Sequence, residues 1–221
     1  MGISIGGDGT FLKMVHDSDF KDIYYAGINT GSLGFLQETQ IKDCNSFIKK
    51  LNNNEYQVED VCIGQINVST KAQEYHYLFL NEIIIRSAQL RTLESNIEVG
   101  DTLLEKFAGD AILVSTTTGS TAQNMGYGGP ILYPTLKAFV LTPIAPIKNR
   151  VYHNLNNSIV ISDNNIITII PEKDDIFVTI DGISTIIQDV VKIKVKISDK
   201  RIKKLKFQDT NFIQIVHDKL L

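Results

Sequence analysis

The segment Gly6-Gly7-Asp8-Gly9-Thr10 constrains the fold of this chain more than any other part of its sequence. It follows Ile3-Ser4-Ile5, which reads as a short buried strand, and it leads into a helical stretch from Thr10 to about His16. A strand that runs into a glycine turn and then a helix presents backbone N–H groups to an anion, and the helix dipole adds to the attraction. Glycines also let a phosphate approach the backbone closely. The segment therefore predicts a phosphate-binding turn in an α/β fold.

The aspartate inside this turn points to chemistry. Asp8 would repel a phosphate, so two useful roles remain for it: holding Mg²⁺ against phosphates, or accepting a proton from an attacking hydroxyl. The alternative is a β-turn in which Asp and Gly only satisfy turn geometry. The chain contains no Gly-x-x-x-x-Gly-Lys-Ser/Thr segment, so this turn is not a P-loop.

Residues 1–60 alternate between strand and helix signals. A second strand is expected over Ile23–Ile28, and one apolar helix face is then formed by Cys44, Phe47, Ile48 and Leu51. Alternating strands and helices indicate a parallel sheet with helices packed on it, which is a small Rossmann-like arrangement. Because the strand at Ile3–Ile5 has no upstream neighbour to pair with, either the first domain is unusually small or the natural chain begins before Met1, and we favour the second.

After about residue 61 the character of the sequence changes to runs rich in β-branched residues, separated by Asn, Asp, Gly or Pro. The expected strand runs are Val61–Thr70, Tyr75–Arg86, Ser158–Ile170, Ile176–Ile180, Ile183–Ile187 and Val190–Ile197. We predict an α/β domain over residues 1–60, a larger β-rich domain over 61–207, and a segment, 208–221, that packs back on the first domain. Ligand sites commonly lie between such domains, so we expect the active site there.

A second glycine loop, Asn29–Leu36, follows the second expected strand. Loops at the carboxyl ends of neighbouring parallel strands converge on one crevice, so two such loops make a wider cradle than one. Phe35 either offers an apolar wall to a planar ring or belongs to the core.

Four further segments carry polar groups that could bind a ligand. Hydroxyls crowd around one glycine in Ser115–Ala122, which suits recognition of ribose, phosphate or an adenine edge, or an over-supplied helix cap. Asn81-Glu82 interrupts an aliphatic run and either recognises ribose hydroxyls or forms a bulge. Asp110 reads as a turn aspartate, and Asp181-Gly182 as a hairpin turn between two Ile-rich strands.

Composition argues against several classes of protein. The net charge is −3, which gives no indication of nucleic-acid or anionic-membrane binding, and no apolar run reaches the length of a membrane span. The cysteines and histidines show no metal-ligand spacing, and the start shows no signal segment. Lysines alternate with aliphatics along residues 192–197, which indicates a strand with one solvated face. We therefore expect a cytoplasmic protein.

Taken together and in this order, these segments resemble the NAD kinase family over essentially the whole chain. The glycine-aspartate motif at Gly6–Thr10 would also fit lipid kinases or phosphofructokinase. The Thr118–Ala122 segment, preceded by Asn81-Glu82, is much more specific to NAD kinases. The other segments that carry the resemblance are Asn29–Leu36, Gly109-Asp110, Gly128-Gly129-Pro130 and Asp181-Gly182.

The resemblance implies transfer of the γ-phosphoryl group of ATP to the 2′-hydroxyl of the NAD adenosine ribose, giving NADP, with Mg²⁺ or another divalent cation. It implies that Asp8 is catalytic and helps to position the cation, and that Gly6, Gly7, Gly9 and Thr10 lie beside the phosphates. It further implies an NAD site formed by Asp8, Gly9, Phe35, Asn81, Glu82, Asp110, Thr118, Thr121 and Ala122. It also implies a homodimer or homotetramer in which a neighbour closes the site, with Ile147 and Tyr152 as candidates for that wall.

The sequence departs from the family pattern at three positions next to these residues. Ala111 stands where the family commonly has Gly, Thr117 where it has Pro, and Gln123 where it has Tyr. The missing tyrosine removes a stacking face, so ligand affinity or preference is expected to differ. Two alternative functions remain open at this point: a non-catalytic NAD(P)-binding sensor, and a lipid or sugar kinase of the same superfold. The sequence does not decide between ATP and polyphosphate as donor, or between NAD and NADH as acceptor.

Overall fold

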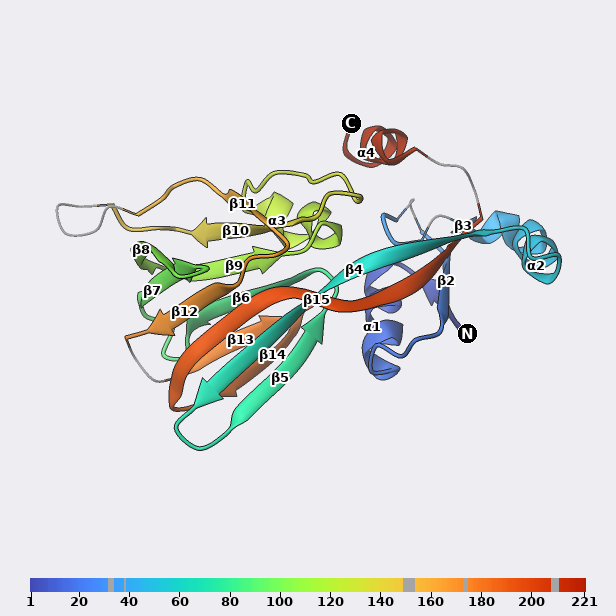
Figure 1. Ribbon diagram of the computed structural model, residues 1–221. Coiled ribbons are helices and arrows are strands. Elements are labelled where there is room, and N and C mark those ends of the chain that lie inside the picture. The colour runs from blue at the N-terminus through green and yellow to red at the C-terminus, as the bar shows by residue number, and fades with distance from the viewer. Residues whose placement is uncertain (32–33, 38, 149–153, 173–174, 208–210) are drawn as a thin grey trace. The chain divides into compact units, whose positions relative to one another are not determined.

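The computed structural model describes residues 1–221 except 32–33, 38, 149–153, 173–174 and 208–210 (Figure 1). The chain forms two compact units: Met1–Val61 with Lys200–Leu221, and Cys62–Asp199. The first is a small α/β unit and the second is β-rich, as the sequence predicts. Residues 200–207 pack with the first unit, although the sequence pattern predicts a β-rich domain that extends to residue 207.

The α/β unit is built on a short parallel sheet. Strand β1 (Gly2–Gly6) pairs parallel with β2 (Tyr24–Asn29), β2 with β3 (Thr39–Gln40), and the end of β15 (Val190–Lys206) with the start of β2. The helical elements of this unit are α1 (Asp8–Asp17), η1 (Ile41–Asp43), α2 (Cys44–Asn52) and α4 (Phe212–Leu220).

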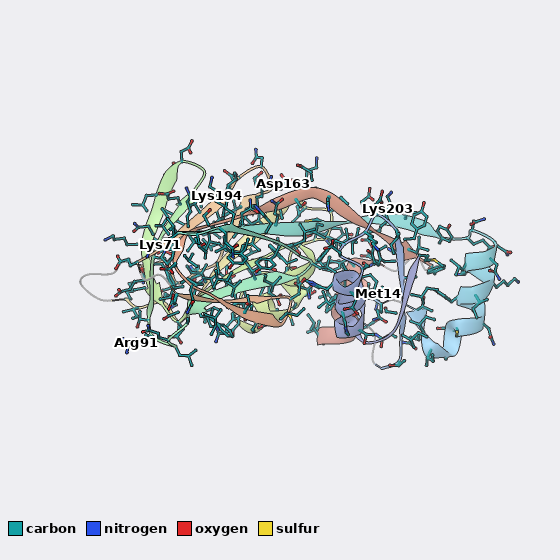
Figure 2. All side chains as sticks on the ribbon, turned by 90° about the horizontal axis from the view of Figure 1, so that it is seen from below. Met14, Lys71, Arg91, Asp163, Lys194 and Lys203 are labelled. Atoms are coloured by element: carbon teal, nitrogen blue, oxygen red, sulfur yellow. The ribbon has the colours of Figure 1, made fainter. Side chains whose placement is uncertain are left out.

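Helices α1, α2 and α4 each bury apolar residues on one face. Helix α1 buries Phe11 and Val15, and its Met14, labelled in Figure 2, lies close to Gly2 of β1. Helix α2 buries Phe47, whose ring packs on Phe207 with centroids 4.5 Å apart. The helical period read from the sequence places Cys44, Phe47 and Leu51 correctly against the core, but Ile48, predicted on the same face, is 49% exposed.

The β-rich unit contains two sets of antiparallel strands. One sheet has the order β11 (Ile159–Ser162), β10 (Ala138–Ile144), β9 (Ala111–Ser115), β6 (Glu82–Ser87), β13 (Ile176–Ile180), β14 (Ile183–Ile187). The other contains β15, β12 (Ile167–Pro171), β7 (Leu93–Val99) and β8 (Thr102–Gly109), with β4 (Gln57–Thr70) paired to β15 and to β5 (Glu74–Phe79). One hydrophobic core draws buried residues from both sets of strands.

Two long apolar runs of the sequence are each broken into two strands. The run expected over Tyr75–Arg86 divides into β5 and β6 at Asn81, and the run over Ser158–Ile170 divides into β11 and β12. The lysine alternation in β15 holds, since Ile193, Val195 and Ile197 are buried while Lys194 is exposed at the outer surface (Figure 2).

One helical interruption lies in the β-rich unit, where the sequence places it. It consists of η2 (Thr118–Thr121) and α3 (Gln123–Gly126), and it follows β9 directly. Among the described residues, no helix is long and apolar enough to cross a membrane.

Candidate active site

The glycine turn at the end of β1 places Asp8 in the first turn of α1. Gly7 is the residue before the helix, and its carbonyl accepts hydrogen bonds from the N–H groups of Thr10 (2.9 Å) and Phe11 (3.3 Å). Gly9 and Thr10 follow within the same helical turn and are exposed. The structure thus has the strand, turn and helix that the sequence predicts for a phosphate-binding turn.

Backbone amides of the second glycine loop hold the Asp8 carboxylate. The N–H of Phe35 donates to Oδ2 at 2.9 Å, and the N–H of Leu36 donates to Oδ1 at 3.1 Å. The same loop approaches so closely that a Cβ on Gly34 would lie 2.2 Å from Asp8 Oδ1. The two glycine loops therefore converge, as expected for neighbouring parallel strands.

Two residues of this site carry no signal in the sequence. Gln37 is fully buried and its side chain donates to the carbonyl oxygen of Gly7 at 2.5 Å. Lys219 on α4 donates to Asp8 Oδ2 at 3.3 Å, and its ammonium lies 4.4 Å from the centre of the Phe35 ring. Lys219 lies 211 residues after Asp8 in the chain, so local patterns give no indication of the contact.

Phe35 is half-buried in the α/β unit. Besides Lys219, it contacts Phe212 of α4, with ring centroids 6.4 Å apart. Both sequence interpretations of Phe35 agree with this position, because part of the ring packs on α4 and part is accessible.

The β-rich unit contains a second group of predicted site residues. Asn81 and Glu82, at the start of β6, are 8% and 4% exposed, and Glu82 lies opposite Ser115 of β9. The 3₁₀ turn η2 lies against this segment so closely that a Cβ on Gly119 would come within 2.0 Å of the Asn81 carbonyl oxygen. Thr118, Thr121 and Ala122 of this region are half-buried.

Hydrogen bonds from the hydroxyl-rich segment fix the carbonyls of residues 80 and 81. Thr116 donates through Oγ1 to Leu80 O at 2.6 Å and through its N–H to Asn81 O at 2.9 Å. Ser120 Oγ accepts from the N–H of Leu132 at 2.9 Å and donates to Thr117 O at 2.7 Å. The residues that precede η2 and α3 make no side-chain capping bond, so these hydroxyls serve instead to bond the backbone of neighbouring segments.

Glu82 is the most perturbed ionisable group of the β-rich unit. Burial raises the pKa of its carboxyl group from 4.5 to about 7, and the nearby charge of Asp181 contributes to the rise. Gln123 donates to Oε1 at 3.2 Å, whereas Oε2 has no hydrogen-bond partner among the described residues. Such a buried and unsatisfied oxygen is available to a hydroxyl donor of a ligand.

Asp110 and Ile147 lie elsewhere in the same unit. Asp110 precedes β9, whose far end pairs with Glu82, and its N–H donates to Ile144 O at 3.0 Å. Ile147 is 36% exposed and donates to Ala108 O at 2.7 Å. About five residues of strand, roughly 17 Å, separate Asp110 from the Glu82 end of β9, so Asp110 does not meet Glu82 within the unit. Tyr152 lies outside the described residues.

Comparison with known proteins connects both groups of residues to one family. Residues 1–56 match the ATP-NAD kinase N-terminal domain, and residues 80–207 match the ATP-NAD kinase C-terminal domain. A NAD kinase from Finegoldia magna is 35% identical over 226 aligned residues, which cover 99% of this chain and 83% of the relative.

Solved structures give the same result for the fold. A NAD kinase from Archaeoglobus fulgidus in complex with ATP superposes with a TM-score of 0.76 at 26% identity, covering 98% of this chain and 82% of that one. Yeast NADH kinase complexed with NADH has a TM-score of 0.87 at 20% identity, and the match covers 99% of this chain and 64% of that one.

Proposed function

Because the chain belongs to the ATP-NAD kinase family, we propose that it transfers the γ-phosphoryl group of ATP to the 2′-hydroxyl of the NAD adenosine ribose through Asp8. The chain is accordingly a phosphotransferase, with NAD as acceptor and ATP as donor. The single observation that carries the assignment to Asp8 is its carboxylate, held by two backbone amides at the end of a glycine turn.

Phosphoryl transfer of this kind depends mainly on positioning of the reactants and neutralisation of charge, and the protein forms no covalent bond to them. A ribose hydroxyl is a poor nucleophile, so Asp8 accepts its proton as the oxygen attacks the γ-phosphorus. The new bond joins O2′ to that phosphorus, the bond from phosphorus to the β,γ-bridging oxygen breaks, and ADP leaves. The amides of Phe35 and Leu36 fix the direction in which the carboxylate points. General-base assistance of this kind contributes about 10²–10⁴ in rate.

A divalent cation fits this site only as a partner of the nucleotide. Among the described residues, no group of three or more His, Cys, Asp or Glu side chains is placed to hold a metal. Mg²⁺ is commonly held by one or two carboxylates together with substrate phosphates. Asp8 can supply one such oxygen, and the phosphates of ATP would supply others; bound there, the cation would neutralise charge on the phosphates.

The roles of the remaining residues follow the family resemblance. Gly6, Gly7, Gly9 and Thr10 lie beside the phosphates, and Phe35 lines the NAD pocket. The NAD residues in the β-rich unit are Asn81, Glu82, Asp110, Thr118, Thr121 and Ala122. Since Asp110 lies a strand length from Glu82, a second copy of the chain in a homodimer or homotetramer would supply the missing wall, with Ile147 and Tyr152 as candidates for it. We place the enzyme in the cytoplasm.

The decisive experiment is NADP formation from Mg-ATP and NAD by the wild-type protein and by Asp8→Asn. We expect wild type to form NADP and the variant to lose turnover by about 10²-fold or more, with NAD binding still measurable. Equal losses of turnover and NAD affinity would argue that Asp8 binds the substrate and does not take its proton. Replacing NAD with diacylglycerol or a sugar should give no phosphorylated product.

A further inference from the structure

Three successive backbone amides converge on one carboxylate at the start of β6. Asp181 Oδ2 accepts from Leu80 N at 2.6 Å, and Oδ1 accepts from Asn81 N at 2.7 Å and from Glu82 N at 3.1 Å. Asp181 N in turn donates to Glu82 O at 3.0 Å. Successive amides that curve around an anion hold a backbone in a defined conformation. The Asn81-Glu82 backbone is therefore shaped by a side chain about a hundred residues further along the chain.

Turn geometry explains a small residue at this position but not its charge. Asp181 has φ 47° and Gly182 has φ 87°, as the two central residues of the tight β13–β14 hairpin require. Asn satisfies such a turn equally well. Asp189 has nearly the same backbone, with φ 53°, in the turn between β14 and β15, and its exposed carboxylate contacts Lys71 at 3.0 Å. What distinguishes Asp181 is the set of three amides.

The segment that Asp181 shapes is the one that presents Asn81 and Glu82. Its carbonyls are bonded to Thr116 and its amides to Asp181, so both edges of the backbone are fixed. Glu82 Oε2 remains without a partner among the described residues. A buried acceptor that the fold orients and leaves unsatisfied costs stability, and a ligand hydroxyl would recover that cost.

We propose that Asp181 is a positioning residue for the acceptor substrate: its carboxylate sets the backbone that aims Asn81 and Glu82 at the hydroxyl groups of NAD. The inference rests on the proposed function, because it names NAD as the ligand of this segment. Asp181 itself contacts no substrate in this scheme and acts through the two residues that it orients.

Asp181→Asn tests the proposal with little change of shape. An Asn side chain keeps one acceptor oxygen but places an N–H₂ group against at least one amide donor, so one bond of the three is lost. We expect the dissociation constant for NAD, measured by titration calorimetry, to rise about tenfold. The KM for NAD should rise with it, while kcat at saturating NAD changes little, because Asp8 is untouched.

Asp189→Asn is the matched control. It makes the same chemical change at a turn residue that also has a positive φ angle. The contact that it loses is an exposed one to Lys71. It should leave NAD affinity at the wild-type value.

The pH profile of NAD affinity separates positioning from loss of structure. Burial and Asp181 raise the pKa of Glu82 to about 7, while Ser115 opposite it and Gln123 beside it are uncharged. Removing the Asp181 charge lowers that pKa, so the inflection in affinity should move to lower pH in Asp181→Asn. Because burial is the larger cause of the raised pKa, exposure of Glu82 in a loosened fold would also move the inflection, so the shift counts for positioning only with an unchanged urea midpoint and circular dichroism spectrum.

The outcomes can be told apart. Wild-type affinity and an unmoved inflection in a folded Asp181→Asn protein overturn the inference, whether or not NADP is formed. Failure of wild type to form NADP overturns the proposed function instead, and the binding comparison still decides the role of Asp181. If circular dichroism shows Asp181→Asn to be unfolded, Asp181→Ser, whose hydroxyl can still accept from one amide, takes its place with the same two expectations.

Discussion

Gly34 shows how closely single atoms determine the Asp8 site. A Cβ at this position would lie 2.2 Å from Asp8 Oδ1 and 2.9 Å from Asn29 Nδ2. In Gly34→Ala either the carboxylate or the loop must move, and the amides of Phe35 and Leu36 belong to that loop. A displacement of about 1 Å in a reacting group costs about 10²-fold in rate, so we expect a loss of that size in NADP formation.

The control for Gly34→Ala is a glycine of the same loop. A Cβ on Gly31 meets only Asn29 Oδ1, at the ordinary contact distance of 3.7 Å. Because the described residues place no other atom within 4 Å of this Cβ, Gly31→Ala should keep most of the activity. Equal activities of the two variants would contradict the tight fit around Asp8.

Gly119 is the glycine of the β-rich unit that lies as close to a predicted site residue as Gly34 lies to Asp8. Its Cβ would lie 2.0 Å from the backbone oxygen of Asn81, which cannot rotate away as a side chain can. We expect Gly119→Ala to lower the free energy of unfolding by about 1–3 kcal/mol, as overpacking does, and to weaken NAD binding. Urea unfolding measures the first effect.

Gly126→Ala, in the neighbouring helix α3, is the comparison for Gly119→Ala. A Cβ there meets no atom of the described part of the chain within 4 Å. Because Ala is favoured over Gly in helices by about 0.5–1 kcal/mol, this variant should be neutral or slightly stabilised. A destabilisation as large as that of Gly119→Ala would show that glycine is needed in this region for its backbone freedom.

At the scale of residues, the sequence identifies those whose chemistry is unusual for their local position. Asp8 in a glycine turn and Asn81-Glu82 inside an aliphatic run both attract attention for that reason. Asp181 reads as an ordinary hairpin residue, since its turn explains it and its three amide partners lie on another strand. Gln37 and Lys219 have no local signal at all, because their contacts depend on the packing of distant segments.

At the scale of elements, periodicity predicts the strand and helix types well but misses where long apolar runs divide. The run at Tyr75–Arg86 breaks at Asn81 because the backbone there bonds to Asp181 and Thr116 instead of continuing one ladder. The strands β7, β8 and β10 are not predicted. In β7, four of the seven residues are polar and one of its glutamates stands at a bulge, so the sequence lacks a clear apolar alternation there.

Helix α4 gives a prediction at this scale. Asn211 caps the helix by accepting from the N–H of Ile213 at 3.0 Å, and Phe212 and Lys219 place α4 against Phe35 and Asp8. Asn211→Ala removes the cap and should destabilise α4 by about 1 kcal/mol. Amide hydrogen exchange should become faster in α4 and remain unchanged in the β-rich unit.

Asn211→Asp restores the acceptor and adds a negative charge at the positive end of the helix dipole. We therefore expect this variant to protect the α4 amides at least as well as wild type does. Faster exchange in both variants would mean that the amide group of Asn211, and not its oxygen, stabilises the helix.

At the scale of the whole molecule, Glu82 links the ligand site to the pH dependence of folding. The pKa of its carboxyl group is 4.5 in ordinary surroundings and about 7 in the fold. Between these values the folded state binds more protons than the unfolded state, so the free energy of unfolding falls as the pH rises through this window. The difference between these two pKa values corresponds to a contribution of up to about 3 kcal/mol to the free energy of unfolding. This contribution is fully present below the lower pKa and is lost above the higher one.

Glu82→Gln isolates this contribution, because glutamine has nearly the same shape and stays neutral at every pH. Urea unfolding at about pH 5 and about pH 8 should show wild type losing more stability than the variant, with the variant the more stable protein at the higher pH. Parallel curves would mean that Glu82 titrates alike in the folded and unfolded states. If the stabilities of the two proteins diverge with pH as expected, the Glu82 carboxylate that we assign to NAD binding destabilises the β-rich unit near neutral pH. Bound NAD should then reduce that loss of stability, because a ligand of the folded state raises its stability.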